Sequence, residues 1–82
     1  MVTIHRAHGL KFVIYVDDHE PAHVHVFGDG QMKIVIEGVG GLPEAVETIG
    51  MKANVGRRAL DVVREHQGAF QARWEDIHGD KS

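Results

Sequence analysis

Apolar and polar residues alternate along the first 37 residues of the chain, which is the pattern of β-strands with one buried face. The alternating runs are residues 2–6, 10–16, 22–27 and 31–37. A Gly-Asp-Gly triplet at residues 28–30 separates the last two runs and is typical of a tight hairpin turn. The pattern therefore predicts an antiparallel meander of three or four strands.

A glycine-rich stretch at residues 38–51 interrupts this alternation. Three of the four residues at 38–41 are glycine, and Pro43 follows closely. Such a composition favours a loop, with room for a short edge strand around residues 46–49.

The apolar spacing changes to steps of three and four after about residue 52, which predicts a helix. The stripe contains Val55, Ala59, Val62, His66, Phe70, Trp74 and Ile77. One continuous helix over residues 53–78 would be roughly 39 Å long, whereas strands of six or seven residues span only about 20 to 23 Å. We therefore expect a break near residues 65–68, where Gly68 lowers the cost of leaving the helix.

Together these patterns predict an α+β fold, in which the meander is followed by two C-terminal helices, or one broken helix, packed on one face. The predicted single domain spans residues 1–82 and divides into an antiparallel sheet (1–37), a glycine-rich loop (38–51) and a helical part (52–79). The predicted core residues of the sheet are Leu10, Phe12, Ile14, Val24, Val26, Met32, Ile34 and Ile36. Against them we expect Val55, Ala59, Val62, Val63, Phe70, Trp74 and Ile77.

Composition narrows the class of protein. The 82 residues are 43% apolar and 26% charged, with a net charge of −3, which argues against a general nucleic-acid-binding protein. The chain has no cysteine, so disulfides, thiolate metal sites and cysteine nucleophiles are excluded. It also has no apolar run of membrane-spanning length, and we expect a soluble cytoplasmic protein with no membrane partner.

The densest group of chemically active side chains is the segment DDHEPAHVH at residues 17–25. If Val24 and Val26 face the helices, His23 and His25 project together from the opposite face, roughly 6.5 to 7 Å apart at Cα. Two imidazoles so placed can chelate one metal ion. The predicted metal ligands are His23 and His25, with Asp18 or His19 on the preceding turn as the third. A nitrogen and carboxylate set without sulfur suits Zn, Mn, Ni or Fe.

Two other interpretations of this segment remain open. In one, Asp17 or Asp18 caps a turn, His19 bonds backbone amides, and the strand histidines are half-buried and paired with a carboxylate or carbonyl. In the other, the segment performs metal-free acid–base catalysis. The candidate catalytic residues are then Asp18, His23 and His25, with His5 adjacent across the sheet and Arg57, Arg58 or Arg64 holding a phosphate.

The helical part offers a candidate surface for a partner protein. Arg57, Asp61 and Arg64 share one face at spacings of four and three, which is typical of a solvated helix surface but also fits a site for phosphate or an acidic partner. Trp74 is the largest apolar side chain and is a candidate anchor. The predicted partner-binding residues are Arg57, Arg58, Arg64 and Trp74.

The chain resembles the small bacterial family catalogued as domain of unknown function 4160. The resemblance rests on an Asp-His-x-Pro-x-His-x-His segment, matched by Asp18, His19, Pro21, His23 and His25, with Ala22 where the family often has a second proline. The helical part also matches, through Ala59–Leu60, the Glu-His pair at residues 65–66, Trp74 and the His-Gly pair at residues 78–79.

The resemblance implies a gene context more than an activity. Members of this family are often encoded beside a member of the family catalogued as domain of unknown function 2442, in pairs similar to toxin–antitoxin modules. We therefore expect a small interaction protein that binds a cognate protein encoded by a neighbouring gene. The alternative function is a histidine-dependent nuclease or a metal-dependent hydrolase that uses Asp18, His19, His23 and His25. The sequence leaves the enzyme status, the substrate and the oligomeric state open.

Overall fold

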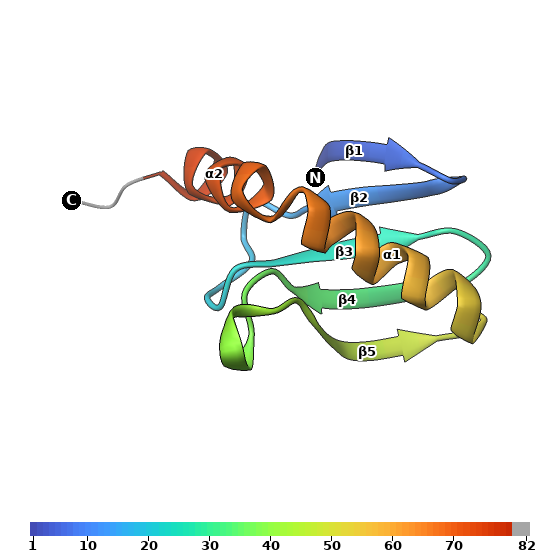
Figure 1. The fold of residues 1–82 in the computed structure, drawn as a ribbon. Helices are drawn as coiled ribbons and strands as arrows, with labels where there is room; N and C mark the ends of the chain where they lie inside the picture. The colour runs from blue at the N-terminus through green and yellow to red at the C-terminus, as the bar shows by residue number, and fades with distance from the viewer. Residues whose placement is uncertain (80–82) are drawn as a thin grey trace.

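The computed structural model describes residues 1–79 as a five-stranded antiparallel sheet followed by two helices (Figure 1). The strands lie in chain order across the sheet: β1 (Val2–Ala7), β2 (Leu10–Ile14), β3 (His23–Phe27), β4 (Gln31–Val35) and β5 (Glu44–Ile49). The helices are α1 (Ala53–Glu65) and α2 (Gln67–His78). This confirms the predicted α+β fold with one strand more than expected. Residues 80–82 of the predicted domain lie outside the described residues.

The additional strand lies in the segment expected to be mainly loop. After a short 3-10 helix, η1 (Val39–Gly41), β5 pairs with β4 from Gln31↔Ile49 to Val35↔Glu44. The edge strand allowed for around residues 46–49 is thus present, and it starts two residues earlier than expected, at Glu44. The alternation that reveals a strand comes from burying one face, and all six residues of β5 are exposed.

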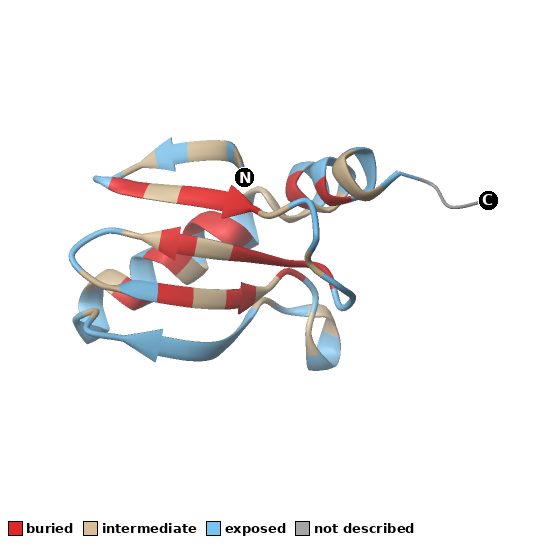
Figure 2. Cartoon of the chain, turned by 180° about the vertical axis from the view of Figure 1, so that it is seen from behind, coloured by how far each residue is buried: buried red, intermediate tan, exposed pale blue. Residues whose placement is uncertain are grey.

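The hydrophobic core lies between the sheet and the helices, and its predicted composition is confirmed. Every predicted core residue of the sheet is buried, as the red positions on β2, β3 and β4 in Figure 2 show. The buried helix residues that pack in this cluster are Ala59, Val62, Val63, Phe70 and Trp74, with Val55 and Ile77 partly buried against it. α1 therefore covers one face of the sheet (Figure 1).

The predicted helix break is present at His66, between α1 and α2. Gly68 lies within α2, so it does not form the break itself. Instead, the Gln67 side chain donates hydrogen bonds to the backbone oxygens of Ile36 (2.7 Å) and Gly41 (2.8 Å). These bonds tie the start of α2 to the segment after β4. α2 then runs beyond the ends of the strands, as Figure 1 shows.

Within residues 1–79, neither helix has the length and apolar character that crossing a membrane requires.

Candidate metal centre

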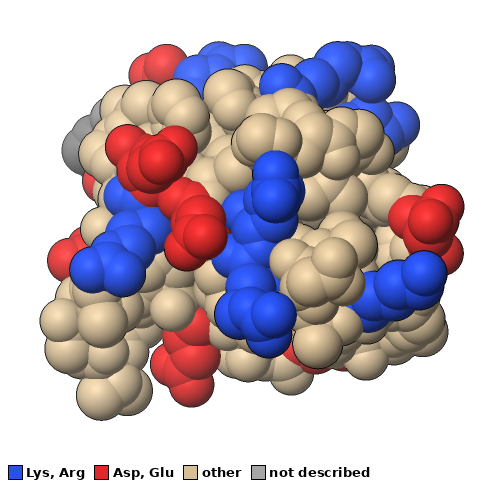
Figure 3. Space-filling model, turned by 45° about the vertical axis from the view of Figure 1, so that its right-hand side comes forward, with Lys and Arg blue, Asp and Glu red and all other residues tan. Residues whose placement is uncertain are grey.

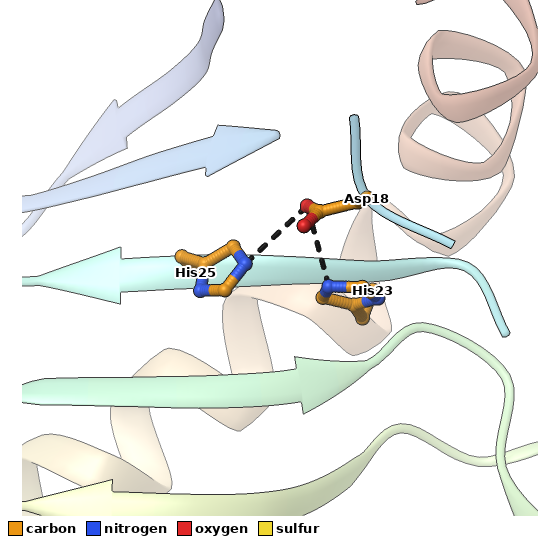
Figure 4. A group of neighbouring side chains, drawn as sticks. All are labelled: Asp18, His23 and His25. Carbon is orange, nitrogen blue, oxygen red and sulfur yellow. Dashed lines mark ion pairs between the residues drawn. The ribbon is translucent and has the colours of Figure 1, made fainter. Parts of the chain in front are cut away.

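His23 and His25 project from β3 on the face of the sheet opposite α1, as the strand alternation predicts (Figure 4). His23 is nevertheless only 5% exposed. It is covered because the segment after β2 folds over it and because Trp74 of α2 lies beside it, with 5.3 Å between ring centroids. The predicted face is therefore right, and His23 is buried on it by these two overlying segments.

A turn after β2 places Asp18 above the two imidazoles. The backbone N–H of Asp18 donates to the Tyr15 carbonyl oxygen (3.1 Å), and the Tyr15 N–H donates to Asp18 Oδ2 (3.2 Å). An Asp side chain that bonds a nearby backbone group is a common turn device. The same two bonds hold the carboxylate of Asp18 against β3.

Three ligand atoms meet at this point. Asp18 Oδ2 lies 3.3 Å from His23 Nε2 and 3.3 Å from His25 Nε2, along the dashed lines in Figure 4. All three atoms lie within 4.8 Å of one another. Tyr15 packs edge-on against His25, with ring centroids 4.7 Å apart, and supports its orientation.

The hydrogen bond on the far side of His23 decides which nitrogen carries its proton. His23 Nδ1 lies 2.8 Å from the backbone oxygen of Pro21, and a carbonyl can only accept, so Nδ1 is the donor. In neutral His23, Nε2 therefore presents a lone pair to the Asp18 carboxylate. Both Nε2 atoms are buried and make no hydrogen bond of good geometry. The lone pair of His23 Nε2 and the Asp18 carboxylate repel each other, and a proton or a metal ion between them would relieve this repulsion.

Burial lowers the pKa of His25 below its usual value, and the neighbouring His23 and Lys33 act in the same direction. The Asp18 carboxylate acts to raise the pKa of His25, but its effect is smaller than the combined lowering. The lowered pKa favours the neutral imidazole, which is the form that binds metal ions.

We expect the metal-free protein to lose stability as the pH falls below about 6.5, the ordinary pKa of histidine. The pKa of His25 is lower in the folded state, so near this pH the unfolded chain binds more protons and acid favours unfolding. Urea unfolding of chelator-treated protein between pH 7.5 and 5 measures this. His25→Gln should show a weaker pH dependence than the unchanged protein. Equal dependence in the two proteins would contradict the expectation.

His19 lies outside the group of three ligand atoms. It is exposed on the turn and lines an open hollow of about 440 Å³ beside the site. The hollow is lined by Asp17, Asp18, His19, Glu20, Pro21, His23, Lys33 and Val46. The structure thus brings three of the four predicted metal ligands together and leaves His19 at the rim.

A comparison with protein families agrees with this sequence pattern. A family model described as Domain of unknown function (DUF4160) matches residues 9–75. The chain belongs to the DUF4160 family. The matched region contains Asp18, His23, His25 and Trp74. No curated protein and no solved structure matched the chain.

In this DUF4160 protein, His5 does not join the strand histidines as the acid–base interpretation allowed. A register shift between Thr3 and His5 pairs Thr3 with Val13 but His5 with Phe12, a core residue. An irregularity of this kind reverses which face the following side chains occupy. His5 therefore packs against Phe70 and His66, with ring centroids 5.7 Å and 4.5 Å away.

The arginines of α1 also lie away from His23 and His25. Arg57, Arg58 and Arg64 are exposed on α1, which covers the opposite face of the sheet (Figure 4). One of them, Arg58, lies 3.3 Å from His8 Nδ1. Figure 3 shows the Lys and Arg side chains of one side of the molecule in separate groups among acidic ones. The structure therefore does not form the predicted site in which an arginine holds a phosphate beside His23 or His25.

Trp74 forms a wall of the site rather than an exposed anchor for a partner. It is 2% exposed, which corrects its prediction as a partner-binding residue. Its Nε1–H donates to Glu20 Oε2 (3.1 Å), and its ring stacks on His78 with 3.8 Å between centroids. The sequence pattern predicted the burial of Trp74 but contained no signal that it lies beside His23.

Proposed function

We propose that Asp18, His23 and His25 bind one divalent transition-metal ion, and that this ion is the functional centre of the protein. The observation that carries the proposal is the convergence of three ligand atoms, two of which are buried imidazole nitrogens without a hydrogen bond of good geometry. Two ligands each about 2.1 Å from a tetrahedral ion are about 3.4 Å apart. The two distances from Asp18 Oδ2, 3.3 Å each, agree with this spacing, and the two imidazole nitrogens lie within 4.8 Å of each other.

The surroundings of the ligands also favour a metal ion. A metal-binding histidine usually donates its other ring N–H to a carbonyl or carboxylate, and His23 donates to the Pro21 carbonyl. The carboxylate of Asp18 is likewise oriented by the Tyr15 N–H. Two imidazoles and one carboxylate suit Zn, Mn, Ni or Fe.

Three protein ligands leave a coordination position open, which is typical of catalytic rather than structural zinc sites. The hollow beside Asp18 and His23 has room for water and a small substrate group. A bound metal ion would supply an activated water at neutral pH. We therefore propose metal-dependent hydrolysis as the activity, in preference to a metal-free nuclease, because the arginines needed to hold a phosphate lie across the sheet.

A second candidate function is the one implied by the family resemblance, an interaction protein of a toxin–antitoxin-like module. In this role the protein would bind, in the bacterial cytoplasm, a cognate protein encoded by a neighbouring gene. The observation that favours it is a group of exposed apolar side chains at Val39, Leu42, Val46 and Ile49. The two functions are compatible, because none of these four residues is a metal ligand, although Val46 also lines the hollow beside the ligands.

The proposed metal site predicts that untagged, chelator-treated protein binds Zn²⁺, Mn²⁺ or Ni²⁺ with a stoichiometry of one. A free metal concentration one hundred times the dissociation constant should raise the free energy of unfolding by about 2.7 kcal/mol. Isothermal titration calorimetry and thermal unfolding measure the two effects. His8→Gln is the matched control, because His8 is an exposed histidine on the β1–β2 turn.

Each result has a defined meaning for the proposal. Identical unfolding curves with and without each of the three metals would refute the site. Stoichiometric binding without chelator-sensitive hydrolysis of ester and phosphodiester probes would retain the site and refute the hydrolase activity.

A further inference from the structure

We infer that the free edge of β5 is a docking site for an extended, positively charged segment of a partner protein, which would add to the sheet as a further strand. This inference rests on the second candidate function, since it specifies how a partner would bind. Adding a strand to an exposed sheet edge is a recurrent mode of peptide recognition, with backbone hydrogen bonds supplying affinity.

The backbone of β5 is available on one side. β5 pairs with β4 and is the last strand of the sheet, and all six of its residues are exposed. Figure 2 shows it as a pale blue strand at the rim, next to the mostly buried strands. One edge of its peptide groups is therefore unpaired among the described residues.

β5 has few of the features that protect edge strands. Natural edges commonly carry lysine, proline or bulges that prevent pairing with another chain. The opposite edge strand, β1, carries Arg6 and a bulge and is partly buried. β5 contains neither a basic residue nor proline. Its only protective feature is the irregularity at Lys33/Ile34 in its pairing with β4.

Exposed apolar side chains are concentrated beside this edge. The described residues include six large apolar side chains that are exposed, and four of these lie between residues 39 and 49. Val39 is 89% exposed, and Leu42, Val46 and Ile49 are each just over half exposed. Concentration of apolar surface at one place is a mark of an interaction site.

The charge of this edge selects the partner. Between Lys33 and Lys52 the only ionisable residues are Glu37, Glu44 and Glu47. A second copy of β5 would bring more carboxylates to the edge without a basic residue, which disfavours self-pairing. A strand that alternates apolar residues with lysine or arginine would match both the apolar and the acidic side chains.

The docking edge and the metal ligands are far enough apart to be tested separately, although Val46 also lines the hollow beside the ligands. Neighbouring strands lie about 4.8 Å apart, so a strand added beyond β5 would lie roughly 14 Å from the backbone of β3. A docked segment would therefore not replace a metal ligand. Loss of metal binding would leave the edge intact, and loss of docking would leave the metal ligands in place.

The test uses synthetic nine-residue peptides and the full chain. A peptide that alternates lysine with valine should bind in fluorescence anisotropy and slow amide hydrogen exchange at residues 44–49. A glutamate–valine peptide and a lysine–valine peptide with alternate N-methylated amides should bind at least about tenfold more weakly.

Matched charge variants locate the binding surface. The double variant Glu44→Gln/Glu47→Gln should bind the lysine peptide about fivefold to tenfold more weakly, because each exposed carboxylate contributes a modest attraction. Asp61→Asn/Glu65→Gln, on the exposed face of α1, makes the same change in net charge and should leave the affinity unchanged.

Three outcomes would overturn the inference. Absence of binding at millimolar peptide would show that the edge is not a docking site. Equal binding of the N-methylated peptide would show that backbone pairing is not involved. Amide protection of β5 that rises with protein concentration, without peptide, would identify a second copy as the occupant.

Discussion

Replacing His23 with alanine is expected to lower the affinity for the metal ion by at least about a hundredfold. Loss of a group that only orients a metal ligand costs 10- to 100-fold, and His23 would be a ligand itself. Its Nε2 is one of the three convergent atoms, and its Nδ1–H bond to Pro21 fixes the ring. Calorimetric titration with Zn²⁺, Mn²⁺ and Ni²⁺ measures the loss.

Because His23 is buried, the alanine variant also loses packing, and its folding must be measured with its affinity. His25→Ala provides the second test, since His25 is only half-buried and its removal disturbs the core less. His8→Ala is the matched control and should bind metal like the unchanged protein. If a folded His25→Ala protein bound metal with unchanged affinity, the assignment of the ligands would be wrong.

Replacing Trp74 with alanine is expected to reduce the free energy of unfolding by about 3 to 5 kcal/mol. The ring is 2% exposed, packs in the core cluster and stacks on His78. Small domains have a total stability of only about 5 to 15 kcal/mol, so the loss is a large fraction of it. Urea unfolding followed by circular dichroism measures the change.

The same substitution should weaken metal binding, because Trp74 supports the segment that carries Asp18. Without the indole, Glu20 loses its hydrogen-bond donor and His23 loses the ring beside it. Trp74→Phe keeps an aromatic ring but not the donor, and should cost only about 1 to 2 kcal/mol. An alanine variant within 1 kcal/mol of the unchanged protein would show that the indole is not part of the core.

The strands that bury one face were predictable because burial imposes a period of two on the sequence. Phe12, Val24 and Ile34 are fully buried where the alternation placed them. β5 was predicted less completely because it buries neither face, so its sequence reflects only propensity. The helix break was predicted near residues 65–68 and lies at His66, but the bonds of the Gln67 side chain to distant carbonyls were not predictable from any spacing.

The candidate site was also predictable from the sequence only in part. Alternation alone determined that His23 and His25 share the face opposite α1. The choice of Asp18 over His19 as their partner depends on a turn whose two hydrogen bonds to Tyr15 are not encoded in any spacing. His5 does not lie beside the two strand histidines, because one irregularity in the pairing of β1 reverses the alternation after it.

The sequence by itself therefore determined the fold class, most of the core and the strand that carries the two imidazoles, since each follows from a local periodicity. Only the tertiary structure decided that Asp18 Oδ2 meets both Nε2 atoms, that Trp74 of α2 closes over His23, and that the arginines lie across the sheet. These relations join segments as far as 51 residues apart, as His23 and Trp74 are, and depend on how the elements pack rather than on their own patterns.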